Sequence, residues 1–101
     1  MVLVTAPDLD TARKLVRGAL KRRFVACGNI IPNIESHYWW EGKLESNPEF
    51  QLLFKTHQDR IADLEDWMVS EHPFETPEFI VIPVESGLQK YLNWIKEETK
   101  S

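Results

Sequence analysis

Apolar residues in this chain recur at two spacings, and the changes between them outline its elements. Residues 1–5 form a short apolar, β-branched run, which predicts a strand that is covered on both faces. Pro7 ends this run. From Asp8, the expected N-cap, residues 8–24 follow the pattern of an amphipathic helix. The apolar face of this helix comprises Ala12, Leu15, Val16, Ala19 and Leu20.

Two extended runs follow, and they predict a long β-hairpin. Residues 24–40 and 43–56 are rich in Ile, Val and aromatic residues, and Glu41-Gly42 lies between them as the turn. A strand over 24–40 would measure roughly 55 Å at about 3.3 Å per residue, whereas a compact domain of this length has a radius of gyration of about 13 Å. Because Pro32 cannot donate a hydrogen bond to a sheet, we expect a bulge there and an arm that protrudes past the core.

The rest of the chain predicts a helix, a strand and a final helix. Residues 57–73 follow a helical period and end at a proline, residues 77–85 form an apolar strand, and residues 86–100 follow a helical period again. The apolar faces comprise Ile61, Leu64 and Met68 in the first of these helices and Leu88, Tyr91, Leu92 and Ile95 in the second.

This order of elements predicts an α+β domain with a ferredoxin-like βαββαβ plan and an additional C-terminal helix. In that plan a four-stranded antiparallel sheet carries its helices on one face. The other face stays uncovered, and water is a poor cover for strands as apolar as these. We therefore expect a neighbouring subunit or a ligand on it.

Composition narrows the class of protein. The 101 residues fit a single domain over 1–101, with 43% hydrophobic residues and a formal charge of -4, which disfavours nucleic acid as a partner. A chain this short buries a limited share of its surface, so oligomerisation is a natural way to bury more. Cys27 is the only cysteine, which excludes a disulfide within the chain, and no targeting or membrane-spanning pattern is present. We expect a cytoplasmic protein without a membrane partner.

Basic residues crowd the polar face of the first helix and offer an alternative, a patch for nucleic acid or membrane. We favour a solvated helix face, because the chain is acidic overall and cations are stabilising near a helix C-terminus. The residues concerned are Arg13, Lys14, Arg17, Lys21, Arg22 and Arg23.

The loop at residues 72–78 holds the first candidate for chemistry. Its two prolines restrict the backbone, and His72 at its start could act as a metal ligand or a proton carrier. Glu71, Glu75 or Glu78 would then be the carboxylate partner. A histidine that ends a helix can equally bond to a nearby carbonyl. Both interpretations stay open at this point.

Seven short pieces of the chain match one family in their order and spacing, although no single piece is specific. They are Val4–Asp8, Ala26–Cys27, Asn29–Pro32, Ser36–Lys43, Lys55–Thr56, His72–Glu78 and Tyr91–Ile95. Through them the chain resembles the CutA divalent-cation-tolerance proteins from Leu3 to about Ile95. The resemblance implies a ferredoxin-like subunit in a tight homotrimer whose hairpin arms pair between subunits. It also implies binding of copper or another divalent metal ion in metal-ion homeostasis.

The resemblance also implies metal residues. Some bacterial members use a first-strand cysteine and two adjacent histidines after the second helix, and here these positions are Val4 and Glu71-His72, so only His72 matches. Cys27 matches a cysteine frequent in the family and would suit copper or zinc as a thiolate. In an apolar strand we favour packing for it, unless three copies meet near a trimer axis. The metal candidates are thus His72, Cys27 and Glu71.

The arm supplies the expected subunit interface. Strand alternation puts Tyr38 and Trp40 on one face and Trp39 on the other, and one face should be buried against a neighbouring chain. Charged residues near the turn and on the partner strand match the family motif, so either a role at the interface or simple solvation is open for them. The interface candidates are Tyr38, Trp40, Glu41, Lys43 and Lys55.

Other functions fit less well. A trimeric signalling or adaptor protein resembling the PII regulators would bind small ligands between subunits, but the glycine-rich, cationic phosphate loop of such proteins is not evident. An RNA-binding domain of the RRM type would need a basic, aromatic third strand. An acylphosphatase-like enzyme would need an arginine-bearing loop after the first strand, where residues 5–10 are acidic. Because no nucleophile, phosphate-loop or metalloprotease motif occurs, we predict no enzyme activity.

Overall fold

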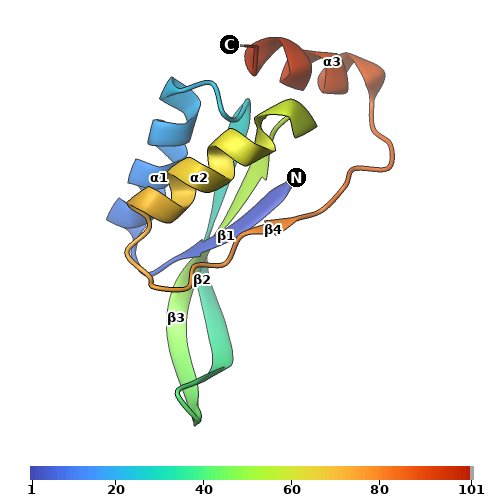
Figure 1. The fold of residues 1–101 in the computed structure, drawn as a ribbon. Helices are drawn as coiled ribbons and strands as arrows, with labels where there is room; N and C mark the ends of the chain where they lie inside the picture. Colours follow the sequence, from blue (N-terminus) through green and yellow to red (C-terminus); the bar gives the residue numbers. More distant parts are fainter. Residues whose placement is uncertain (101) are drawn as a thin grey trace.

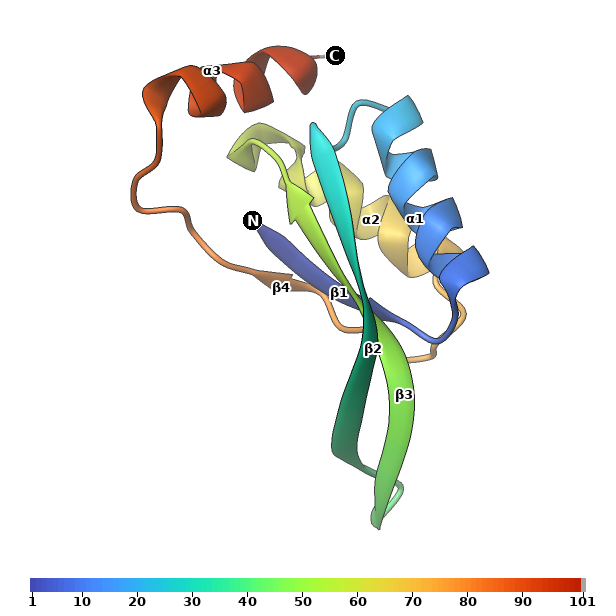
Figure 2. The same cartoon turned by 180° about the vertical axis from the view of Figure 1, so that it is seen from behind.

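The computed structural model describes residues 1–100 and shows an α+β fold in two layers (Figure 1). The sheet has the order β2-β3-β1-β4, with every neighbouring pair antiparallel. Helices α1 and α2 lie on one face of this sheet, and Figure 2 shows the other face without a helix across it. The predicted four-stranded antiparallel sheet with one covered face is confirmed. The elements are β1 (Val2–Ala6), α1 (Leu9–Lys21), β2 (Cys27–Trp40), β3 (Lys43–Lys55), a 3₁₀ turn (Gln58–Arg60), α2 (Ile61–Glu71), β4 (Ile80–Val81) and α3 (Gln89–Glu98).

Helix α1 begins and packs as its sequence predicts. Asp8 has an extended backbone, and its carboxylate accepts a hydrogen bond of 2.7 Å from the backbone N–H of Thr11. This bond holds the pKa of Asp8 below its usual value. Leu20 departs from the prediction, because it is exposed on the last turn. The residues that α1 buries are Ala12, Leu15, Val16 and Ala19.

The core lies between the two helices and the sheet. In β1 the side chains of Val2, Val4 and Ala6 are fully buried, whereas Leu3 and Thr5 are only partly buried. The expectation that β1 is covered on both faces is therefore wrong for a single chain, since only the helix side has a cover. The other fully buried side chains include Leu52 and Phe54 from β3 and Leu64 and Met68 from α2.

The β2–β3 hairpin forms the predicted arm. Pairing runs from Cys27 and Lys55 to Trp40 and Lys43, and it is interrupted by an irregularity between Ile31 and Ile34, on either side of Pro32. Because β1 pairs with β3 only as far as Phe50, the part of the hairpin beyond it has no third strand. The molecule measures 44 × 26 × 21 Å, and the arm extends along its long axis (Figure 1).

The last third of the chain departs most from prediction. The expected strand over residues 77–85 is reduced to Ile80–Val81, and both residues are exposed. Ile95 of α3 is buried, but Tyr91 and Leu88, the residue before the helix, are exposed, although the prediction put all three on one apolar face. Strand β4 pairs only with Val2 and Leu3, and α3 lies beyond the end of the sheet (Figures 1 and 2). The apolar pattern was correct, but a single chain offers these side chains too little surface to pack against.

The hairpin turn gives a direct test of the arm. Glu41 and Gly42 both have positive φ, 48° and 78°, as a two-residue turn of type I′ requires. An added Cβ at Gly42 would meet nothing within 4 Å, so Gly42→Ala changes only backbone strain. We expect it to lower the free energy of unfolding by about 1 kcal/mol, measured by urea unfolding at fixed protein concentration.

The matched variant for this test is Glu41→Asn, because asparagine tolerates positive φ better than glutamate. It should leave the stability unchanged or raise it. Equal losses in both variants would contradict the type I′ assignment.

Candidate functional site

A groove extends along the arm to its base, where the end of β1 and the loop after α2 complete it, and residues of both faces of β2 line it. Thr5 pairs with Gln51, and Ile34 pairs with Glu49, so these side chains share one sheet face, while Val4 and its partner point into the core. We call this space, of about 810 Å³, the arm-base groove. Its walls come from β1, the arm and the loop after α2. They comprise Thr5, Ile34, Ser36, His37, Tyr38, Trp39, Trp40, Glu49, Gln51, Pro73, Phe74, Glu75, Thr76 and Glu78.

Gln51 connects the sheet to the loop at the floor of the groove. Its side-chain amide donates to the Glu78 carboxylate at 3.0 Å and to the carbonyl oxygen of Val4 at 3.1 Å. Further along the arm, the Tyr38 hydroxyl accepts a hydrogen bond of 2.6 Å from the Asn47 amide. These bonds hold the Glu78 carboxylate and the Tyr38 ring in place among the lining residues.

Glu49 is the most enclosed charged residue of the groove. Only 9% of its surface is exposed, and over residues 1–100 its carboxylate has neither a hydrogen bond nor an ion pair. Among the described residues, the buried side-chain nitrogen or oxygen atoms without a partner are Arg60 Nε and Trp67 Nε1, so the Glu49 carboxylate oxygens keep contact with solvent at the groove surface.

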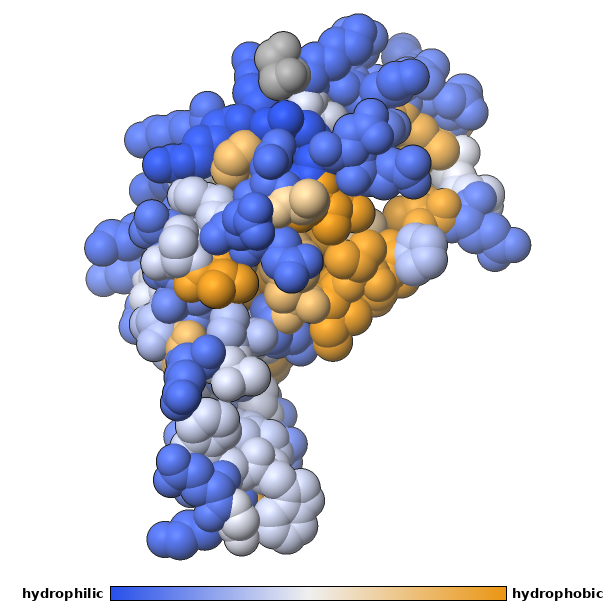
Figure 3. All heavy atoms as spheres, in the orientation of Figure 1, coloured by the Kyte–Doolittle hydropathy of each residue, from blue (hydrophilic) through white to orange (hydrophobic). Residues whose placement is uncertain are grey.

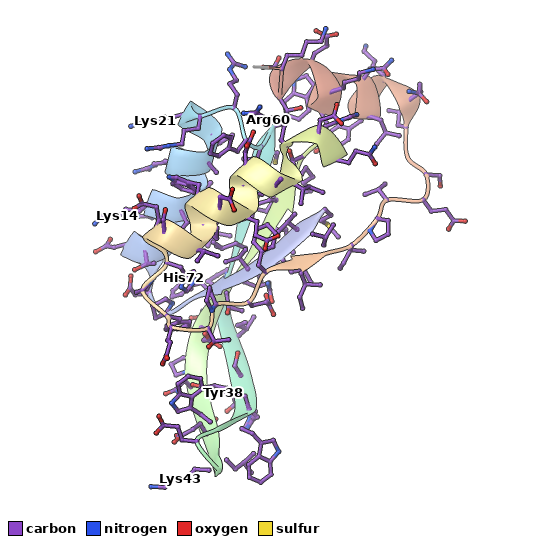
Figure 4. All side chains as sticks on the ribbon, in the orientation of Figure 1. Lys14, Lys21, Tyr38, Lys43, Arg60 and His72 are labelled. Atoms are coloured by element: carbon purple, nitrogen blue, oxygen red, sulfur yellow. The ribbon has the colours of Figure 1, made fainter. Side chains whose placement is uncertain are left out.

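His72 closes the α2 end of the loop and is buried, with 7% of its surface exposed. Its Nε2 lies 2.7 Å from the carbonyl oxygen of Thr5, and its Nδ1 accepts a hydrogen bond of 3.0 Å from the backbone N–H of Phe74. Since a carbonyl can only accept, the ring proton must be on Nε2. Both nitrogens are engaged, and Figure 4 shows His72 beside the sheet rather than in solvent.

The three metal candidates do not come together in one chain. Cys27 pairs with Lys55 at the end of β2 far from the arm, and its thiol is 3.8 Å from the Asn29 side-chain oxygen. Glu71 is exposed. His72 is bonded to Thr5, near the end of β1 that lies away from Cys27. Within the described part of the chain, no group of three or more His, Cys, Asp or Glu side chains could hold a metal ion. The residues of a single chain therefore do not fit a metal centre, and the metal assignment stays a prediction.

The interface candidates lie where the arm is open. Tyr38 and Trp40 are 38% and 42% exposed, and Trp39 is 73% exposed. Figure 4 shows Tyr38 along the arm and Lys43 at its tip. Glu41 forms the turn, and Lys55 donates a hydrogen bond to Asn29 on β2. Their place in an interface stays a prediction.

Comparison with known proteins identifies the family. The family model described as CutA1 divalent ion tolerance protein matches residues 1–98. The chain belongs to the CutA1 family. A relative named divalent-cation tolerance protein CutA, from Archaeoglobus fulgidus, is 38% identical over 96 residues, which cover 95% of this chain and 93% of that protein.

Other CutA relatives differ in length and in the compartment that their names give. The chloroplastic CutA of Arabidopsis thaliana is 38% identical, and the match covers all of this chain but 56% of that protein. A solved structure of CutA from Archaeoglobus fulgidus, titled periplasmic, superimposes with a TM-score of 0.95 at 37% identity and covers 98% of this chain and 96% of its own. In residues 1–100 no helix is long and apolar enough to cross a membrane.

Sequence reasoning did not single out Glu49 or Gln51, although both line the groove. One signal was available. Glu49 stands in an extended run between apolar neighbours, two residues before Gln51, so alternation already put two polar side chains on one face of a sheet. The loop that completes the groove comes from a distant part of the chain, and alternation says nothing of it.

The bonds of His72 lead to a stability prediction. His72→Ala leaves the Phe74 N–H and the Thr5 carbonyl without their partners, and we expect it to lower the free energy of unfolding by about 2–3 kcal/mol. His37→Ala is the matched control, because its ring is exposed and only approaches Glu35 at 3.5 Å. That variant should stay within about 0.5 kcal/mol of the parent protein in urea unfolding. Similar losses for both histidines would show that the two bonds contribute nothing specific.

Proposed function

We propose that this CutA1-family protein acts in divalent-cation tolerance as a homotrimer of ferredoxin-like subunits, without an enzyme activity of its own. The observation that supports it most is the apolar surface that one chain leaves open around β4, α3 and the arm. Family membership supports the link to divalent ions, since the relatives are named for tolerance to them and not for a reaction. The strand order β2-β3-β1-β4 supports the ferredoxin-like description.

The exposed apolar surface around β4 and α3 supports assembly with other copies of the chain. Figure 3 shows hydrophobic atoms gathered where Figure 1 places β4 and the chain that leads to α3. Single exposed apolar residues are ordinary, but a contiguous patch of this kind marks an interaction site. The exposed residues on these two elements and their connection are Ile80, Val81, Ile82, Val84, Leu88, Tyr91 and Trp94.

The arm supports pairing between subunits. Beyond Phe50 it has no third strand, so both of its edges can accept a neighbouring chain. Tyr38 and Trp40 would then be covered by a neighbour, with Glu41 and Lys43 at the rim. Lys55 lies at the other end of β3, where it would contribute through its bond to Asn29.

The two tryptophans of the arm test the assembly. Trp40→Ala should weaken the trimer more than Trp39→Ala, because the face of Trp40 continues the uncovered face of the sheet, while Trp39 is 73% exposed. Light scattering from micromolar to nanomolar concentration measures this directly. We expect the parent protein to stay trimeric and the Trp40 variant to dissociate at about tenfold higher concentration or more than the Trp39 variant. A monomeric parent protein would remove the proposal.

We propose that copper or another divalent ion is held between chains. Within one chain His72 is bonded at both nitrogens, and Cys27 lies at the opposite end of the sheet. Three Cys27 thiols near a symmetry axis would supply a soft ligand set that a single thiol cannot. Glu71, exposed at the end of α2, could add an oxygen ligand from a neighbouring copy.

Calorimetric titration of metal-free protein with copper and zinc tests this arrangement. With three thiols at one axis, saturation should occur near one ion for three chains, and Cys27→Ser should abolish it. His72→Ala, beside the His37→Ala control, separates a ligand from a structural histidine. Equal binding by the parent protein and both Cys27 and His72 variants would exclude these residues as ligands.

A signalling or adaptor trimer is the second candidate, and the arm-base groove favours it. In such a protein the groove would become a cleft between subunits that binds a small ligand. A thermal-shift screen with nucleotides distinguishes the two candidates, since a bound ligand raises the melting temperature.

A single cysteine supports a reducing compartment such as the cytoplasm for either function.

A further inference from the structure

We propose that the outer face of α1 docks a short acidic segment of a partner protein, bound in an extended conformation. The inference goes beyond the proposed function, because it concerns the helix layer and not the surfaces where subunits are expected to meet. Exposed cations are ordinarily only solvated, and the case here rests on their lack of partners, their spacing and their location. The residues concerned, which we call the basic stripe, are Arg13, Lys14, Arg17, Lys21 and Arg22.

The basic stripe has little negative charge of its own chain to balance it. Residues 13–23 hold half of the twelve lysine and arginine residues, although the chain has a formal charge of -4. Of the ion pairs between described residues, only that of Arg23 with Glu98 involves this span. Exposed helical cations often pair with an acid three or four residues away, but Asp10 is the only acid in the open depression that the stripe lines. The stripe therefore presents unbalanced positive charge to solvent.

The helix that carries the basic stripe is held firmly against α2. Trp67 of α2 lies so close to Gly18 that a Cβ added at Gly18 would be 2.5 Å from the indole ring. Arg22 donates a hydrogen bond of 3.1 Å to the carbonyl oxygen of Gly18, and its guanidinium carbon lies 5.1 Å from the centre of the Trp67 ring. These contacts fix the C-terminal end of the stripe.

The spacing of the cations fits an extended peptide. Arg13, Arg17 and Lys21 follow one another at four-residue intervals, and each interval advances about 6 Å along an α-helix. In an extended peptide every second side chain points to the same side, and these side chains are about 6.6 Å apart. Three acidic side chains at alternate positions can thus face the three cations in turn.

The surroundings of the basic stripe limit the anion to a short one. Asp10 lies at its N-terminal end, and α2, beside α1 in the same layer, carries the exposed acids Glu65, Asp66 and Glu71 (Figure 1). A nucleic acid strand that ran beyond the stripe would meet this negative charge. It would also find no aromatic ring among the residues that line the depression on which to stack a base. A short acidic segment of a protein needs neither a longer track nor a ring.

A membrane surface fits the basic stripe less well. Helices that lie in a membrane interface place an apolar face in the lipid. The apolar face of α1 is buried against its own core, and of that face only Leu20 is exposed. The stripe thus has charge for anionic lipid but no apolar face beside it to anchor the helix.

The proposed assembly leaves the basic stripe accessible. The arm, β4 and α3 are the parts expected to meet neighbouring chains, whereas α1 lies on the face of the sheet opposite the uncovered one (Figure 2). Figure 4 shows Lys14 and Lys21 extending outward from α1. Each subunit of a trimer would offer one stripe, so a partner with several acidic segments could bind more than one subunit at once.

Two peptides of equal composition and charge test the match in spacing. One alternates four glutamates with four threonines, the other carries the four glutamates in one block, and both bear a neutral dye for fluorescence anisotropy with the full chain. At about 20 mM salt the alternating peptide should bind saturably and about threefold more tightly, because the block turns only half of its acids to one side. Raising the salt to about 150 mM should weaken its binding about tenfold, since exposed charges are screened.

Variants of the basic stripe test which residues bind the peptide. Arg17→Gln removes the central cation and should weaken binding of the alternating peptide about threefold to fivefold. Adding Arg13→Gln and Lys21→Gln should weaken it about twentyfold or more. Because glutamine is as good a helix former as arginine and lysine, the melting temperatures should stay near that of the parent protein.

The matched control makes the same change in net charge at the other end of the chain. It combines Lys90→Gln, Lys96→Gln and Lys100→Gln, which replace exposed lysines in and after α3. Its affinity for the alternating peptide should stay within about twofold of the parent protein. Equal losses in the stripe and control variants would show general charge attraction only and overturn the inference, as would equal affinity for the two peptides.

Two further probes and the state of assembly complete the test. Tighter binding of oligouridylate, or of vesicles that contain phosphatidylserine, than of the alternating peptide at the same salt would overturn the inference. Light scattering on the same samples separates it from the proposed function. A trimer that does not bind the alternating peptide overturns the inference alone, whereas a monomer that binds it through Arg17 supports the inference and contradicts the trimer.

Discussion

The ladder between β2 and β3 runs from Cys27 and Lys55 to Trp40 and Lys43, whereas β1 accompanies β3 only from Phe54 to Phe50. This mismatch in strand length shapes the rest of the molecule. The short part of the ladder belongs to a sheet with helices on it and can be buried in the usual way. The long part has neither a third strand nor a helix, so its side chains have to find partners elsewhere. The irregularity beside Pro32 marks the boundary between the two parts.

The same constraint explains why the last elements are loosely held. Helices α1 and α2 lie on one face of the sheet and α3 lies beyond its end, so the opposite face has no cover of its own. Strand β4 pairs through only two residues, and α3 is tied to the remainder by contacts such as the 2.8 Å pair between Arg23 and Glu98. An exposed ion pair contributes little to stability. Burial of apolar surface against other copies would stabilise β4 and α3 more than this ion pair does. Because the hydrophobic effect is non-directional, one such contact could cover both elements.

The arm-base groove arises from the same geometry. The arm leaves the sheet where β1 ends, and the loop from His72 to Glu78 turns back at that point, bonded to β1 through His72 and to β3 through Gln51. Side chains from three distant segments therefore meet around Glu49. The histidine that looked like a metal ligand has a structural place in this arrangement, since its two nitrogens fix the loop that forms one wall.

Much of this protein follows from local pattern. The helix that Asp8 caps, the turn at Glu41-Gly42 and the bend at Pro32 are where the sequence predicts them, because capping, positive φ and a missing N–H act within a few residues. How far Ile80, Leu88 and Glu49 are covered depends instead on segments tens of residues away along the chain. Hydrophobic periodicity says that a side chain seeks cover but not whether its own chain supplies it. Only the tertiary structure decided that question, since the covered area depends on strand lengths and on the path of the connecting loops.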